Sequence, residues 1–190
     1  MKQLPALLAA GAAALLAAGP AAAHPRLSPP VSVAGALQLY SLAVPTEKAN
    51  ATTTKVVLTV PPGFGIDSFV PSPGWTRVER STGSGEGAVV TQVTWTGGRV
   101  PTGEDALFQF LAEPARPGTY AFRVEQTYSD GEVVDWADPE TGESPAPTIA
   151  VERSLGGGSS TLAIVALAVG AVGILVGGIA LATRGGRPLA

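Results

Sequence analysis

The chain has no cysteine, one histidine and a single methionine, and these shortages exclude several kinds of site. Without cysteine, neither a disulfide framework nor a thiolate metal site can form, so a folded domain must depend on its own core. A Ser-His-Asp triad would have to use His24, which stands in a proline-rich N-terminal stretch. The sequence also has no G-x-S-x-G elbow and no phosphate-binding glycine loop. We therefore expect no catalytic residues, no cofactor-binding loop and no enzyme activity.

Basic residues are scarce in the middle of the chain. Residues 24–153 hold nine lysines and arginines against fifteen aspartates and glutamates, which gives a net charge of −6. A domain with this charge lacks the positive surface that nucleic acids require. We therefore expect no nucleic-acid partner.

The N-terminal end, residues 1–23, has the three-part layout of a secretory signal peptide. It begins with Lys2, continues as an apolar run and ends in three alanines. Cleavage after Ala23 leaves alanine at positions −1 and −3, whereas cleavage one residue later would place Pro25 at +1. The layout therefore predicts His24 as the mature N-terminus. The alternatives are a retained membrane anchor or cleavage two residues earlier.

The C-terminal apolar run, residues 161–183, carries no charge and is long enough to cross a hydrocarbon core of about 30 Å as a helix. Two arginines follow in residues 184–190, which predicts a short cytoplasmic tail. A flexible Gly/Ser-rich tether, residues 154–160, separates this helix from the exported domain, residues 24–153. We therefore predict a single-pass protein of the cell membrane, with its domain on the extracytoplasmic side.

Within residues 24–153, short runs alternate apolar and polar residues and are separated by proline and glycine. Examples are "TKVVLTV", "VVTQVTW" and "LFQFLA". Period-two patterning with these turn signals predicts an all-β fold, an antiparallel β-sandwich of the immunoglobulin or cupredoxin kind. A further run, "YAFRVEQTY", sets five residues on one face: Tyr120, Phe122, Val124, Gln126 and Tyr128.

One hairpin can be predicted in more detail from "YSDGEVVDW", residues 128–136. Asp130-Gly131 between two apolar runs favours a two-residue type I′ turn, in which both central residues have positive φ. That turn pairs Glu125 with Trp136 and sets Trp136 on the more polar face of the sheet. The alternatives are a bulge that reverses the register or a tryptophan packed under a loop.

An N-terminal histidine offers a metal ion two nitrogens from one residue, the α-amine and the ring Nδ1. Copper(II) suits this chelate because it prefers a tetragonal set of nitrogen and oxygen donors. Pro25 has no amide proton, so its nitrogen cannot become a third donor, and carboxylate, water or a partner must complete the site. After cleavage no methionine, cysteine or second histidine remains, which disfavours copper(I), zinc and two-histidine oxygen chemistry. Both nitrogens bind unprotonated, so affinity should fall below neutral pH.

Several longer blocks of the domain resemble the YcnI family of exported copper-binding proteins. They are "AHPRLSPP" at the cleavage point, "VPTEKANATTTKVVLTVPPG" (44–63), "PSPGWTRVE" (71–79), "VTWTGGRVPTGE" (93–104) and "QTYSDGEVVDWADP" (126–139). The resemblance implies a β-sandwich with one copper(II) in a single-histidine brace at the mature N-terminus, near a glutamate and a tryptophan. The matching metal-site residues are His24 and Glu47, with Trp136 adjacent to the site and not a firm ligand.

Two functions follow from these patterns. The first is a membrane-anchored copper(II)-binding protein for copper acquisition, trafficking or buffering, whose partners are the copper ion and another membrane copper-transport protein. The second is a surface adhesion or protein-interaction sandwich without metal, in which Trp75, Trp95 or Trp136 contacts a protein or glycan. A variant with one extra residue before His24 distinguishes the two functions, because the extra residue converts the α-amine to an amide. A copper protein should lose most of its copper affinity, whereas an adhesion protein should be unaffected.

Overall fold

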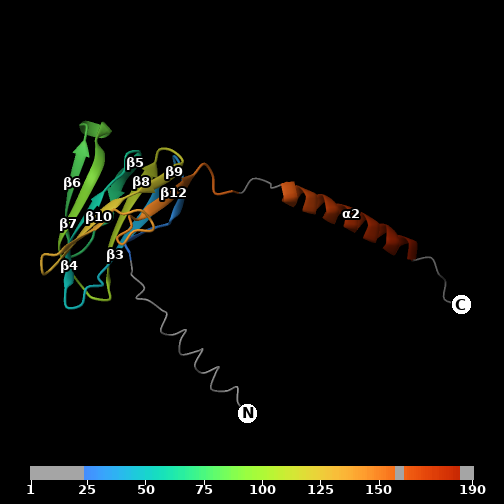
Figure 1. Ribbon diagram of the computed structural model, residues 1–190. Helices are drawn as coiled ribbons and strands as arrows, with labels where there is room; N and C mark the ends of the chain where they lie inside the picture. The colour runs from blue at the N-terminus through green and yellow to red at the C-terminus, as the bar shows by residue number, and fades with distance from the viewer. Residues whose placement is uncertain (1–23, 157–160, 185–190) are drawn as a thin grey trace, which may run out of the picture. The chain divides into compact units, whose positions relative to one another are not determined.

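The computed structural model of the chain describes residues 24–156 and 161–184 (Figure 1). The predicted signal peptide, residues 1–23, and most of the predicted tail lie outside the described residues. The chain divides into two compact units between Arg153 and Ser154, and each is described by itself.

The first unit is built from β-strands. They are β1 (Arg26–Ser28), β2 (Val31–Val33), β3 (Gln38–Pro45), β4 (Thr52–Thr59), β5 (Phe64–Phe69), β6 (Thr76–Thr82), β7 (Val89–Pro101), β8 (Asp105–Pro114), β9 (Gly118–Ala121), β10 (Arg123–Tyr128), β11 (Val133–Trp136) and β12 (Thr148–Glu152). Within residues 24–156 they form sheets in the orders β1-β3-β8-β5, β11-β10-β4-β7-β6 and β2-β12-β9. Neighbours are antiparallel except β2 and β12, which run parallel. The predicted all-β antiparallel fold is confirmed, with this one parallel pair as a departure.

The four-stranded and five-stranded sheets meet across an apolar core. Trp95 on β7 stacks on Phe108 on β8, with ring centroids 4.2 Å apart. Val56 and Leu58 on β4 are fully buried, as the alternation of "TKVVLTV" predicts. Burial of each such side chain stabilises the fold by about 1.5–3 kcal/mol, so the core can hold the domain without a disulfide.

One alternating run, "YAFRVEQTY", serves two sheets. Its first part forms β9, which pairs with β12, and its second part forms β10, which pairs with β4. Phe122 lies between these two strands and is buried, and alternate residues from there to Tyr128 are buried as well. The predicted face is therefore confirmed, and it places one polar side chain, Gln126, in the core.

The hairpin between β10 and β11 differs from the prediction. Val124 pairs with Trp136, one residue away from the expected partner Glu125. Gly131 has a φ of +90° while Asp130 does not have a positive φ, which fits a three-residue loop closed by a glycine bulge rather than a type I′ turn. Because side chains alternate along a strand, this shift turns Trp136 from the polar face into the core, where it is 6% exposed.

The second unit holds the helix α2 (Thr161–Arg184), one residue longer than the predicted span. Its segment Ala163–Leu181 has a mean hydropathy of 2.6 and is long and apolar enough to cross a membrane. The sequence-based expectation of one C-terminal apolar helix is confirmed.

Candidate metal centre

The structure brings together two of the three predicted site residues, His24 and Trp136. Their ring centroids lie 5.6 Å apart and their ring planes are at 87°, an edge-to-face contact. Trp136 is buried whereas His24 is partly exposed, so the indole forms a fixed wall against one side of the imidazole. The contact joins the start of the described chain to the end of β11.

The N-terminal residues are held on the edge of the four-stranded sheet by the pairing of β1 with β3. Arg26 lies opposite Ala43, and the two strands are antiparallel. His24 lies two residues before β1, and the same register continued to it would set His24 opposite Pro45, the last residue of β3. Glu47 follows only two positions later. The sheet therefore directs His24 toward the loop that carries the predicted carboxylate.

Glu47 lies in that loop with its side chain exposed, beside the buried Tyr128. Burial raises the pKa of Tyr128 above its usual 10, and the negative charges of Glu47 and Glu132 raise it further. The next residue, Lys48, forms ion pairs with Asp130 and Glu132 at the tip of the β10–β11 hairpin. The loop is thereby tied to the same hairpin that supplies the tryptophan.

A buried polar network lies beneath the histidine–tryptophan pair. Nε1 of Trp136 donates a hydrogen bond to Oε1 of Gln126 at 3.1 Å. Nε2 of Gln126 donates to the Pro45 carbonyl at 2.8 Å and to Oγ1 of Thr53 at 2.7 Å. The hydroxyls of Thr53 and Thr46 lie 2.6 Å apart. Sequence reasoning missed this network, although a glutamine at a core-facing position of an alternating run was its visible signal.

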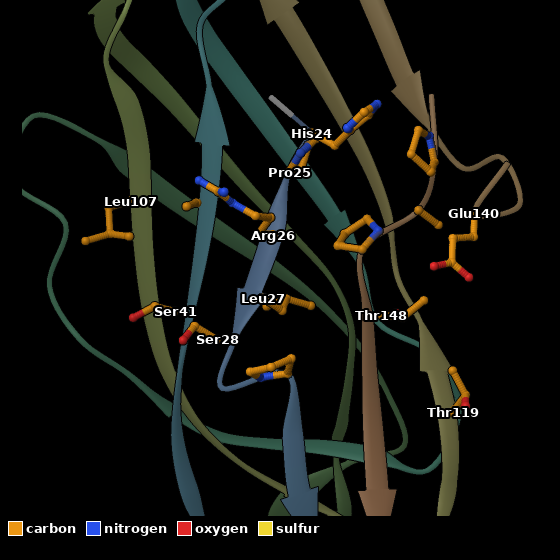
Figure 2. Close-up of a pocket in the computed structure, with 15 residues that line it drawn as sticks. His24, Pro25, Arg26, Leu27, Ser28, Ser41, Leu107, Thr119, Glu140 and Thr148 are labelled. Atoms are coloured by element: carbon orange, nitrogen blue, oxygen red, sulfur yellow. The ribbon is translucent and has the colours of Figure 1, made fainter. Parts of the chain in front are cut away.

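His24 also lines an open pocket of about 810 Å³. Figure 2 shows Arg26 and Leu27 along one wall, with Glu140 on the facing segment. Trp136 is not among the lining residues, so the imidazole has the indole on one side and the pocket on another. Glu140 was not predicted from the sequence as a site residue.

Side chains alone do not make a conventional metal cluster here. Among residues 24–156 and 161–184, no three His, Cys, Asp or Glu side chains gather closely enough to hold a metal ion. A metal centre built on His24 therefore needs donors of another kind, and the backbone amine of a mature N-terminus is one that copper(II) accepts.

The three tryptophans differ in their access to a surface partner. Trp95 and Trp136 are 1% and 6% exposed and belong to the core. Trp75 is partly exposed and packs edge-on against Phe108, with ring centroids 5.0 Å apart. Of the three tryptophans that could contact a partner of an adhesion protein, only Trp75 is more than slightly exposed.

Comparisons with known proteins agree with this fold. Residues 24–151 match the family model described as a domain of unknown function, DUF1775. The "Copper-binding protein CutI" of Bacillus subtilis (strain 168) is 32% identical, with 87% of this chain and 88% of that protein covered. A crystal structure from Nocardia farcinica, described as having an immunoglobulin-like fold, is 31% identical with a TM-score of 0.58. That match covers 67% of this chain and 97% of the other.

Proposed function

Because the chain belongs to the YcnI-like family of DUF1775 domains, we propose that it is a membrane-anchored, extracytoplasmic copper(II)-binding protein. The name of the Bacillus subtilis relative supports a copper-related function. The proposal of a single-histidine brace rests on two points: the metal-binding chemistry of His24 as a mature N-terminus, and the position of His24 against Trp136. The family match begins at this same residue.

In the proposed site, His24 supplies the α-amine and Nδ1 to one copper(II) ion, which is bound as cargo. Glu47 supplies an oxygen, and Trp136 forms a wall that limits access of solvent and competing ligands. The observation that carries this proposal is the edge-to-face contact of His24 with Trp136. The sheet register, which directs His24 toward the Glu47 loop, supports it as well.

The C-terminal helix would keep this site close to the outer surface of the membrane, with the C-terminus in the cytoplasm. A copper(II) ion held there on two nitrogens from one residue leaves coordination positions for a partner. We therefore infer a role in acquisition, trafficking or buffering, with exchange of copper with another membrane copper-transport protein. No step of this role requires the protein to act as an enzyme.

The first experiment is a copper(II) electron paramagnetic resonance spectrum of the processed chain, with His24 confirmed as its first residue by intact mass. We expect one tetragonal site with nitrogen couplings. A matched variant with one glycine before His24 keeps every side chain but loses the α-amine, so its spectrum should change and its copper affinity should fall. A spectrum that this added glycine leaves unaltered would contradict the brace.

Glu47→Gln tests the oxygen donor separately. The change removes the charge of an exposed side chain, so the fold should stay intact while copper affinity falls. Unchanged affinity in this variant would remove Glu47 from the site and leave the brace itself in place.

A further inference from the structure

Gln126 is a fully buried polar residue on a face that otherwise packs the core. Its neighbours on that face of β10 are Val124 and Tyr128, both buried. Burying an amide costs free energy unless its groups find partners, so a glutamine here needs a reason that packing alone does not supply.

The partners of Gln126 fix its orientation. An indole N–H can only donate, so Trp136 must face Oε1. A backbone carbonyl can only accept, so Pro45 must face Nε2. The second hydrogen of Nε2 goes to Thr53. A turn of the amide by 180° would break two of these bonds, so the side chain has one favourable arrangement.

The two ends of the amide reach opposite sides of the proposed site. Oε1 holds the indole of Trp136, which packs against the ring of His24. Nε2 holds the carbonyl of Pro45, which precedes the loop carrying Glu47. One rigid side chain on β10 is thus bonded to both the wall and the loop.

We propose that Gln126 is a positioning residue, which sets the distance between the His24 side and the Glu47 side of the copper site through its bonds to Trp136 and Pro45. The inference rests on the proposed copper function. Copper(II) favours a defined tetragonal geometry, so a donor loop that can drift binds it less well. Groups that orient the ligands of metal sites typically change affinity by about 10- to 100-fold when they are removed.

The test uses the processed full-length chain in lipid nanodiscs, with copper(II) alone as the ligand. Gln126→Met keeps the length of the side chain and removes its hydrogen bonds to Trp136, Pro45 and Thr53. We expect about tenfold weaker copper binding in competition titrations, together with a heterogeneous electron paramagnetic resonance spectrum in place of one site.

Two matched controls separate positioning from stability. Thr53→Val removes a buried partner of Gln126 but leaves its bonds to Trp136 and Pro45, so it should destabilise the fold and leave copper affinity within about threefold of the parent. Gln92→Met makes the same replacement on β7, where the glutamine bonds to Thr59. It should change neither the stability of the fold nor the copper affinity.

A measurement without copper tests the hydrogen bond from Gln126 to Pro45 directly. Hydrogen–deuterium exchange should be faster in the peptide spanning residues 45–50 of Gln126→Met, because the Pro45 carbonyl has lost its partner. The same peptide should be unaffected in Gln92→Met. If Gln126→Met does not fold, Trp136→Phe tests the tryptophan side of the link alone, since it removes the indole donor, keeps a ring beside His24 and leaves the bond to Pro45. Copper affinity should then fall without faster exchange in residues 45–50, and unchanged affinity would contradict the positioning role.

The outcomes distinguish this inference from the proposed function. Equal losses of affinity in Gln126→Met and Thr53→Val, or parent-like binding in Gln126→Met, would overturn the positioning role alone. Copper binding that survives an added glycine before His24 would instead overturn the brace, whatever the Gln126 variants do. Selective loss in Gln126→Met, with faster exchange in residues 45–50, supports the inference.

Discussion

Replacing Trp136 with phenylalanine should lower the free energy of unfolding by about 2 kcal/mol, most of it through a single lost hydrogen bond. The indole N–H donates to Oε1 of Gln126, and Gln126 is 0% exposed, so water cannot replace the lost donor. An unsatisfied buried acceptor costs about 1–3 kcal/mol. Trp136→Ala would add the loss of packing, since such truncations in a core cost about 3–5 kcal/mol.

The measurement is urea unfolding of the domain, residues 24–153, followed by circular dichroism. With a slope of about 1–3 kcal/mol per molar urea, the Trp136→Phe midpoint should fall by about 1 M. A control, Trp75→Phe, changes a partly exposed ring and should shift the midpoint less.

A double variant tests the assigned cause. If the penalty comes from an unpaired Gln126 acceptor, adding Gln126→Met to Trp136→Phe should cost less than the sum of the two single changes. Strictly additive effects, or a Trp136→Phe loss below about 0.5 kcal/mol, would refute the reasoning.

Three further results are expected. Gly98→Ala would place a Cβ 2.1 Å from Cζ2 of Trp75, so it should lower the melting temperature, whereas Gly87→Ala meets nothing within 4 Å and should not. Lys48 holds the pKa of Asp130 below its usual 3.8, so the stability this carboxylate contributes is present above pH 3.8 and lost as pH falls through the lowered value. Lys48→Met should therefore flatten the fall in unfolding free energy below pH 3.8, as measured by urea unfolding across pH. Removing copper with a chelator should leave the far-ultraviolet circular dichroism unchanged, since the core does not need the metal, and lower the stability only by the linkage of binding to folding.

The fold class could be predicted because its signals are local. Alternation in "TKVVLTV" is enough to place Val56 and Leu58 inward, and both are fully buried in the structure. The apolar C-terminal helix could be predicted in the same way, because a helix long and apolar enough to cross a membrane is recognised from its own length and composition.

The register of the β10–β11 hairpin could not be predicted from local sequence signals. An Asp-Gly pair suits the two-residue turn, yet the observed loop has three residues and a positive φ only at its glycine. A partner distant in sequence favours that loop, because the loop buries Trp136 against His24, a contact that is not visible in the hairpin's own residues. Within the hairpin, the loop also sets the indole N–H of Trp136 against Gln126 on β10. The same distance in sequence hid the bond from Gln126 to Pro45.

The pairing of β12 on both of its edges determines how firmly the last strand of the domain is held. The chain leaves the sheet at Glu152 and continues toward the helix that begins at Thr161. β12 is the middle strand of its sheet, and β2 and β9 pair with it on both sides. The backbone hydrogen bonds on both edges must therefore break before β12 can leave the sheet. The last strand of the domain is held as an internal strand, although the chain continues from it into the C-terminal segment.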